Sequence, residues 1–181
     1  MQVFLIAAMT LDGYIARSAL ERSFDWTTPE DKVFYISKIK EAMHMVLGST
    51  TLKTFSRFPR GMTCYIYTRH PENFSSEGLS SAATFEPTNE SPQALVKRLA
   101  AAGVEKLAIC GGATIYSQFL QAGVVNKLYL TIEPILFGQG VRLFSGESLE
   151  QRLQLVKSEK MNETGTVLVE YDVLGIQPSD G

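Results

Sequence analysis

The stretch Leu107-Ala-Ile-Cys-Gly-Gly-Ala-Thr-Ile-Tyr116 decides the fold. Residues 105–110 predict a short buried strand, which the pair Gly111-Gly112 ends, and residues 113–120 carry apolar side chains at helical spacing. A strand, a glycine turn and a helix bring the free N–H groups of the helix to the end of the strand. Such a site favours an anion such as a pyrophosphate. A tight connection that needs glycine only for its dihedral angles stays the alternative.

The composition fits one globular domain, because 181 residues with 45% hydrophobic side chains can bury a sizeable core. A balance of 17 basic against 19 acidic residues excludes the global basic field of a nucleic-acid binder, so phosphate binding must be local. Cys64 and Cys110 lie in apolar runs, which favours buried free thiols and a reducing, cytoplasmic location. The apolar run Met1–Met9 has no positive n-region and is far shorter than a membrane span of ~20 residues.

Strands and helices alternate along the chain up to residue 133. Further strands are expected at residues 2–9, 45–48, 63–68, 82–85, 127–133, 153–159 and 166–173, and helices at 29–43, 49–55 and 92–102. This order predicts an α/β fold with a mainly parallel sheet, helices on both faces and an antiparallel C-terminal hairpin. Ligands bind at the carboxyl ends of such strands. One cleft should therefore gather Ala8, Gly48, Thr68, Arg69, Gly111, Gly112 and the segment 131–133.

The segment from residue 25 to residue 43 has the pattern of a helix with an acidic start. A threonine cap precedes Pro29 at the first helical position, and Glu30 and Asp31 occupy the first turn. The apolar stripe is expected to consist of Val33, Phe34, Ile36, Ile39 and Met43, with Asp31 and Tyr35 at its margin. A carboxylate there can accept hydrogen bonds from a bound ligand. The alternative is that the two acids serve only the helix dipole.

Several motifs together resemble the dihydrofolate reductase superfamily. Ala7-Ala-Met-Thr-Leu-Asp-Gly-Tyr-Ile-Ala16, Ile109-Cys-Gly-Gly-Ala-Thr-Ile-Tyr-Ser-Gln-Phe-Leu120 and Leu128-Tyr-Leu-Thr-Ile-Glu-Pro134 are similar to its first strand, cofactor helix and following strand. Leu136-Phe-Gly-Gln-Gly-Val-Arg-Leu-Phe144 resembles the branch that includes the reductase domain of the bifunctional riboflavin-biosynthesis deaminase-reductase. Trp26-Thr-Thr-Pro-Glu-Asp31 instead resembles the substrate helix of true dihydrofolate reductases. The resemblance implies a single three-layer dihydrofolate-reductase-like domain.

The resemblance implies NADPH as the cofactor. Ala8 and Ile15 would flank the nicotinamide, threonines at a helix start would take phosphate oxygens, and Arg69 would lie near the 2′-phosphate. The family often has an arginine where Ser49 stands, which leaves NADH open. The residues expected to contact the cofactor are Ala8, Ile15, Gly48, Ser49, Thr50, Thr51, Thr68, Arg69, Cys110, Gly111, Gly112, Ala113, Thr114, Ile115 and Tyr116. A solvated Arg69 is the alternative.

Asp31 is the expected catalytic carboxylate, and the resemblance implies that Thr131 supports it by a hydrogen bond. Tyr35 would bind substrate beside Asp31, and Trp26 and Phe55 would wall the pocket, although both aromatics fit a core equally well. No metal site is expected, because the two histidines and two cysteines lack the spacing of a zinc deaminase.

The resemblance implies a reductase that transfers hydride to a C=N of a small pyrimidine or pteridine, similar to 5-amino-6-(5-phosphoribosylamino)uracil reductase. Dihydrofolate reductase proper and a non-catalytic NADPH-binding protein are the alternatives. Dihydrofolate is expected to be a poor substrate, because Met62 stands where the family clamps the folate tail with an arginine, and Arg60 starts too far away. A homodimer is expected, partly from the resemblance and partly from the apolar run Ile132–Phe144.

Overall fold

The computed structural model describes residues 1–146 and 150–175, and its centre is one large sheet. The strands of this sheet are β1 (Gln2–Thr10), β3 (His44–Gly48), β4 (Thr63–Tyr67), β5 (Thr84–Thr88), β6 (Lys106–Ile109), β7 (Lys127–Glu133), β9 (Leu153–Lys160) and β10 (Val167–Val173). They lie in the order β5-β4-β3-β6-β1-β7-β10-β9.

The expected parallel sheet with an antiparallel C-terminal hairpin is confirmed. All neighbouring pairs from β5 to β7 run parallel, whereas β10 is antiparallel to β7 and to β9. Asn162 closes the β9–β10 hairpin, because its Oδ1 accepts hydrogen bonds from the backbone N–H groups of Gly165 and Thr166 at 3.1 and 3.0 Å. The hairpin turn lies where Asn162-Glu-Thr-Gly165 predicts it.

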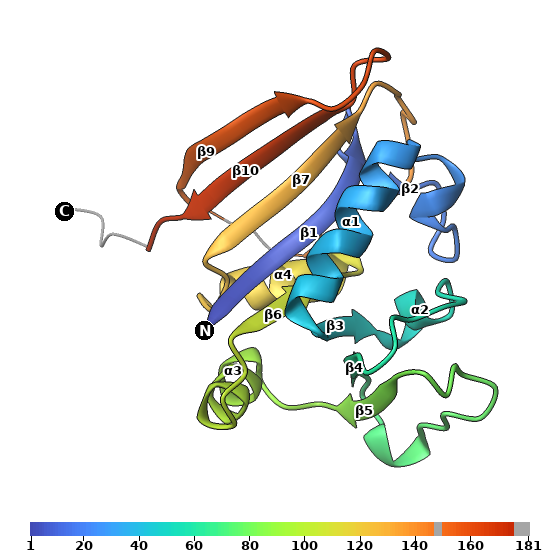
Figure 1. Cartoon of the computed structure of the whole chain (residues 1–181), viewed down its shortest axis with the longest axis vertical. Helices are drawn as coiled ribbons and strands as arrows, with labels where there is room; N and C mark the ends of the chain where they lie inside the picture. Colours follow the sequence, from blue (N-terminus) through green and yellow to red (C-terminus); the bar gives the residue numbers. More distant parts are fainter. Residues whose placement is uncertain (147–149, 176–181) are drawn as a thin grey trace.

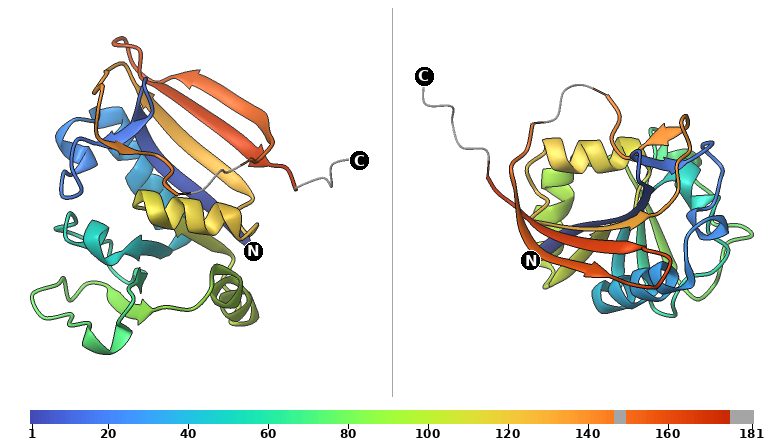
Figure 2. Two further views of the ribbon diagram at one scale, coloured as in Figure 1. Left: turned by 180° about the vertical axis from the view of Figure 1, so that it is seen from behind. Right: turned by 90° about the horizontal axis from the view of Figure 1, so that it is seen from above.

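Helices cover both faces of the sheet, which makes three layers. They are α1 (Pro29–Ala42), α2 (Ser49–Leu52), α3 (Pro92–Ala101) and α4 (Ala113–Gln121). The α1 helix crosses the front of the sheet in Figure 1, and α3 and α4 lie on the opposite face, as the rear view in Figure 2 shows. Each face therefore has its own hydrophobic core.

The apolar run of β1 shows why this strand lacks polar alternation. Val3 and Leu5 pack into the core beneath α3 and α4, while Phe4 and Ile6 pack into the core beneath α1. All four side chains are at most 3% exposed. A strand buried on both faces needs apolar residues at every position, as its sequence predicts.

The buried face of α1 differs from the expected apolar stripe. Val33 is 70% exposed and Ile36 is 38% exposed, whereas Asp31 is only 3% exposed. The helix buries Asp31, Ile39 and Ala42, which share one face at helical spacing. Phe34, Ile39 and Met43 of the expected stripe do pack against the core beneath α1, so the stripe is confirmed in part.

The edge strand expected at residues 82–85 begins later, at Thr84, and ends at Thr88. It pairs in parallel with β4, and Pro87 lies opposite Ile66. Proline lacks the N–H that a central strand must donate, and its presence fits an edge position. The sequence-based boundary stopped before this proline.

A small second sheet was missing from the sequence-based expectations. It pairs β2 (Tyr14–Ala16) with β8 (Val141–Arg142), and two 3-10 helices, η1 (Ser23–Asp25) and η2 (Pro71–Asn73), lie in expected loops. The Asp12 carboxylate accepts hydrogen bonds from the N–H groups of Phe137 and Gly138 at 3.2 and 2.7 Å. These contacts tie the turn after β1 to the loop after β7. Strands of two or three residues are too short for a periodic signal.

Gly140 should be the more sensitive of two glycines in that loop. Gly138 and Gly140 both have positive φ, 73° and 145°, but only at Gly140 would a Cβ collide with the carbonyl oxygen of Ala16. We expect each alanine variant to lose roughly 1 kcal/mol of unfolding free energy, because alanine is strained at positive φ. Gly140→Ala should lose a further ~1–3 kcal/mol because the clash displaces β2. Equilibrium urea unfolding measures both, and equal losses would show that the loop yields without disturbing β2.

Candidate active site

The carboxyl ends of β1, β3, β4 and β6 open onto a cavity of about 630 Å³. Its volume lies within the range of small-molecule sites, ~300–1,000 Å³. Most residues expected at the site line it, namely Ala8, Ile15, Asp31, Tyr35, Gly48, Ser49, Thr50, Thr51, Phe55, Thr68, Arg69, Cys110, Gly112, Ala113, Thr114, Ile115 and Tyr116. Three others, Gly111, Trp26 and Thr131, do not line it.

The glycine turn between β6 and α4 is crowded by the protein itself. Gly111 has a φ of 102°, and a Cβ there would lie 3.0 Å from the Tyr116 ring. A Cβ on Gly112 would lie 3.0 Å from the Thr51 hydroxyl, and the peptide bond between the two glycines is cis. Gly111 lies behind the wall, where its carbonyl accepts a hydrogen bond from the Gly48 N–H at 2.8 Å. Local geometry therefore explains Gly111, while Gly112 opens α4 at the cavity.

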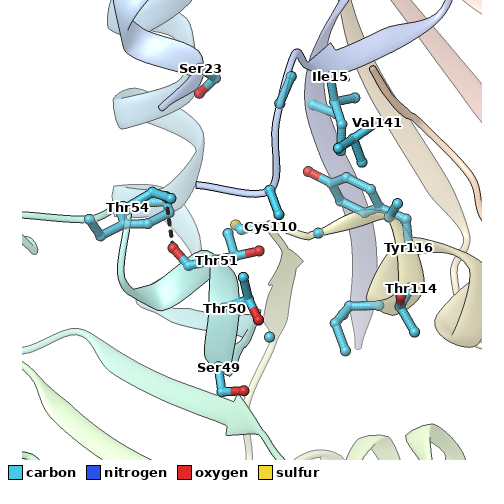
Figure 3. Close-up of a pocket in the computed structure, with 18 of the residues that line it drawn as sticks. Ile15, Ser23, Ser49, Thr50, Thr51, Thr54, Cys110, Thr114, Tyr116 and Val141 are labelled. Atoms are coloured by element: carbon cyan, nitrogen blue, oxygen red, sulfur yellow. Dashed lines mark hydrogen bonds between the residues drawn. The ribbon is translucent and has the colours of Figure 1, made fainter. Parts of the chain in front are cut away.

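Polar side chains face the cavity from α2 and α4. Figure 3 shows Ser49, Thr50 and Thr51 on one side and Thr114 on the other, with Cys110 between them. The Tyr116 hydroxyl donates a buried hydrogen bond to the carbonyl oxygen of Ile6 at 2.8 Å, which fixes the ring against β1. Burial raises the pKa of the Cys110 thiol to about 12, so this cysteine is a neutral wall residue.

Arg69 lies at the end of β4, next to α2, and its side chain is exposed. Within residues 1–146 and 150–175, no carboxylate forms an ion pair with it. Thr68 lines the cavity beside it, and its hydroxyl accepts a hydrogen bond from the His70 N–H at 3.3 Å. A guanidinium without an internal partner is available to an anionic ligand.

Asp31 is a buried carboxyl group that lines the other end of the cavity. Desolvation raises its pKa from 3.8 to about 6, and the negative charge of Glu133 adds to the rise. The hydroxyl groups of Thr27 and Thr131 lie beside the carboxyl and oppose this rise. Thr131 is 2% exposed, so its hydroxyl lies on the protein side of the carboxyl. A buried acid with a raised pKa at a cavity is typical of functional sites.

Glu133 is a buried residue to which the sequence analysis gave no role. Its Oε1 accepts hydrogen bonds from the backbone N–H and the hydroxyl of Thr28 at 2.7 and 2.9 Å, and its Oε2 accepts one from the Thr166 hydroxyl at 2.8 Å. Thr28 is the residue before α1, as expected, but its hydroxyl makes no bond to the helix backbone. The start of α1 is thus held by a carboxylate from β7. The position of Glu133 in a mainly apolar strand was the signal in the sequence that could have identified this contact.

The aromatic residues expected in the substrate pocket divide into two groups. Tyr35 and Phe55 line the cavity, with ring centroids 6.5 Å apart, and among the described residues the buried Tyr35 hydroxyl has no hydrogen-bond partner. Burial raises the pKa of Tyr35 well above its usual value. The structure corrects the prediction for Trp26, which packs against Phe137 with a centroid distance of 5.1 Å, outside the cavity. Phe24 forms the wall instead, edge-on to Tyr35 at 5.7 Å.

Part of the cavity wall comes from segments that sequence reasoning treated as polar loop. The residues that it did not single out for the site include Ser18, Ala19, Glu21, Ser23, Phe24, Thr54, Asn89, Gln118 and Val141. Phe24, the aromatic residue in the mainly polar segment 17–25, was the available signal. In the part of the chain that the structure describes, no three His, Cys, Asp or Glu side chains group as metal ligands, and no helix is long and apolar enough to cross a membrane.

Comparison with known proteins gives related sequences and related folds. The model of the RibD C-terminal domain matches residues 1–167. The "uncharacterized protein YwjB" of Bacillus subtilis (strain 168) is 27% identical over 167 residues, which cover 88% of this chain and 91% of that protein. The 2,5-diamino-6-ribosylamino-4(3H)-pyrimidinone 5′-phosphate reductase of Methanothermobacter thermautotrophicus is 32% identical over 88 residues, 45% of this chain and 40% of that protein. A pyrimidine reductase-like protein of Corynebacterium diphtheriae shares the fold, with a TM-score of 0.76, 19% identity and coverage of 96% and 92% of the two chains.

The raised pKa of Asp31 should make the stability of the protein depend on pH. A carboxyl whose pKa is about 6 in the folded state and 3.8 otherwise stabilises the fold at low pH, and this contribution is lost as pH rises through 6. We expect the free energy of unfolding of Asp31→Asn, measured relative to wild type, to rise by about 2 kcal/mol from roughly pH 4.5 to pH 8. Urea unfolding across this range is the measurement, with Asp25→Asn as the control for loss of one charge. If the difference in unfolding free energy between Asp31→Asn and wild type does not change with pH, the carboxyl is not desolvated.

Proposed function

Since the chain belongs to the RibD C-terminal domain family, as its sequence motifs predicted, we propose that it is an NADPH-dependent reductase. The reaction is hydride transfer to a C=N bond of a small pyrimidine or pteridine. The observation that carries this proposal is the cavity, which joins an anion-binding helix start at Gly112 to a buried carboxylate at Asp31. The reductases named among its relatives support the reaction class.

The residues at the Arg69 end of the cavity fit the phosphates of NADPH. The start of α4 presents backbone N–H groups and the positive end of its dipole, and Thr50 and Thr51 add hydroxyl donors. The Arg69 guanidinium suits the 2′-phosphate dianion. Ala8 and Ile15 leave an apolar surface for a planar ring between the two ends. When bound, NADPH supplies the hydride.

Asp31 polarises the substrate in this proposal. Its carboxylate is ionised above about pH 6 and accepts hydrogen bonds from the N–C–N edge of the ring. Withdrawing electron density in this way makes the neighbouring carbon a better hydride acceptor. The neighbouring Thr27 and Thr131 hydroxyls lower the pKa of the carboxyl and so favour its ionised form. A protein that only binds NADPH has no use for a desolvated acid at the cavity, so Asp31 favours catalysis over the non-catalytic alternative.

The structure offers no clamp for a folate tail at the position where dihydrofolate reductases carry one. Met62 is completely buried in the core beneath α1, and neither Met62 nor the exposed Arg60 lines the cavity. A thioether cannot pair with a carboxylate. This favours a small heterocycle over dihydrofolate as the substrate.

Arg69→Ala should weaken NADPH binding by ~1.5–3 kcal/mol, the range for hydrogen bonds to charged groups, while sparing NADH. Quenching of protein fluorescence by each nucleotide gives the two dissociation constants. Arg60→Ala, which removes an exposed arginine outside the cavity, is the matched control. Equal losses of affinity for both nucleotides would show that Arg69 does not bind the 2′-phosphate.

Asp31→Asn should lower turnover by ~10²–10⁴-fold with nearly unchanged NADPH affinity, because the amide keeps the shape and removes the charge. A screen of NADPH oxidation with pyrimidines and pterins measures it. Glu30→Gln, which removes the neighbouring exposed charge, should keep turnover. Normal turnover in Asp31→Asn would show that a residue other than Asp31 polarises the substrate.

A homodimer remains part of the proposal, and the structure offers a second surface beside the one that the sequence suggested. In the run 132–144, Leu143 is 6% exposed and Phe137 packs on Trp26, but Leu136 is 66% exposed. Leu155 and Val156 on the edge strand β9 are also exposed, at 52% and 50%. We expect sedimentation of a dimer that Leu155→Lys dissociates, because exposed apolar edges favour pairing. A monomer at all concentrations would exclude it.

A further inference from the structure

The tip of the β9–β10 hairpin contacts the start of α1. Figure 1 shows the turn between β9 and β10 at the end of the sheet where α1 begins. The side-chain amide nitrogen of Asn162 donates hydrogen bonds to the Glu30 carboxylate at 3.1 Å and to the Thr166 hydroxyl at 3.0 Å. That hydroxyl is buried and donates in turn to the Glu133 carboxylate at 2.8 Å. The hairpin is therefore connected both to α1 and to β7.

The Glu133 carboxylate also holds the first turn of α1. Its Oε1 accepts hydrogen bonds from the N–H and the hydroxyl of Thr28 at 2.7 and 2.9 Å. A threonine before a helix ordinarily accepts a hydrogen bond from a backbone N–H in the first turn, but the Thr28 side chain makes no such bond. The start of the helix is therefore fixed against β7. Asp31 lies in this first turn, three residues after Thr28.

Glu133 acts on the charge of Asp31 as well. It follows Thr131 by two positions on β7, so both side chains point to the same face of the sheet. Burial is the main cause of the raised pKa of Asp31, and the Glu133 charge adds to it, whereas threonine hydroxyls and the Lys32 charge oppose it. From α4, the Tyr116 phenol interacts with the Asp31 charge, but burial raises the pKa of Tyr116 well above its usual value and keeps it neutral. Among these groups, Glu133 is the charged one that comes from another element.

Stability alone does not account for a buried carboxylate at position 133. Removing a carboxylate from water is costly, and well-packed apolar side chains often stabilise such a place equally well or better. An apolar side chain provides no directed hydrogen bonds, whereas Glu133 binds Thr28 and Thr166 at distances of 2.7–2.9 Å. Its presence is therefore explained by the geometry that it imposes on the start of α1.

We propose, on the basis of the reductase function above, that Glu133 and Thr166 are positioning residues for Asp31. Neither lines the cavity, and none of the residues 153–173 of the hairpin, all of which the structure describes, lines it. Both act through Thr28, which fixes the first turn of α1 and so sets where the Asp31 carboxylate meets a ligand. The C-terminal hairpin thus contributes to the reaction without touching the substrate.

Turnover of a pyrimidine or pterin with NADPH tests the role of the hairpin. Thr166→Val removes the hydroxyl with little change of shape, and we expect kcat to fall by roughly 10–100-fold, the effect of a small misplacement at a reacting centre. NADPH affinity should not change, because these hydrogen bonds involve no residue proposed for the cofactor. Thr166→Ser, which keeps the hydroxyl, should retain turnover. So should the matched control Thr164→Val, because the exposed Thr164 hydroxyl binds Asn162 in the same turn.

A second measurement needs no turnover. The unfolding free energy of Asp31→Asn, relative to its parent protein, rises as pH passes the pKa of Asp31, so the pH of this rise reports that pKa. In a Glu133→Gln background, which keeps the shape and removes the charge, the rise should shift to lower pH. A Glu170→Gln background, which removes a carboxylate of β10 that pairs with Lys127, should leave the rise where it is.

The two measurements separate this inference from the proposed reaction. If no pyrimidine or pterin is reduced but the rise shifts in Glu133→Gln, the reductase proposal fails and the positioning of Asp31 stands. Normal kcat in Thr166→Val, an equal loss in Thr164→Val or in Thr166→Ser, or a matching loss of NADPH affinity would overturn the inference. An unshifted rise in Glu133→Gln would overturn it as well. If Glu133→Gln does not fold, the turnover of the Thr166 variants decides.

Discussion

The buried carboxylate of Glu133 is the interaction on which the geometry of the site depends. It is 2% exposed and satisfied by three hydrogen bonds from Thr28 and Thr166. A charge removed from water costs several kcal/mol unless donors replace the lost solvent, so these bonds are required by its burial. Because the donors come from the start of α1 and from the C-terminal hairpin, one carboxylate joins helix, sheet and hairpin. Asp31, three residues after Thr28, takes its position from that junction.

Two buried acids thus meet at one end of the sheet in different surroundings. Glu133 is enclosed by donors, whereas Asp31 lines the cavity and keeps part of its hydrogen-bonding capacity for a ligand. Desolvation, with a contribution from the charge of Glu133, leaves the Asp31 carboxylate less stable than it would be in water. A ligand that donates hydrogen bonds to this carboxylate offsets the cost, which adds to its affinity.

The sequence predicted those features that depend on local chemistry. Uniform burial of β1 follows from its unbroken apolar run, and the strand-to-helix turn follows from Gly111-Gly112. What failed depends on contacts distant in sequence. The burial of Asp31 and the exposure of Val33 on α1 were not predicted, and Trp26 packs against Phe137, far along the chain, rather than lining the cavity. Such departures from pattern are expected at functional sites, where a polar group is buried for a purpose.

The hydrogen bonds that position α1 also constrain the order in which the molecule assembles. The bonds from Thr28 to Glu133 span 105 residues, and the bond from Asn162 to Glu30 spans 132. Contacts this distant require closure of long loops and form late relative to local pairings. The pairing of β1 with β7 joins residues such as Phe4 and Lys127, which are 123 residues apart, so the central sheet forms under the same constraint. The geometry around Asp31 is complete only once the hairpin has docked, which couples the last part of the chain to acquisition of the site.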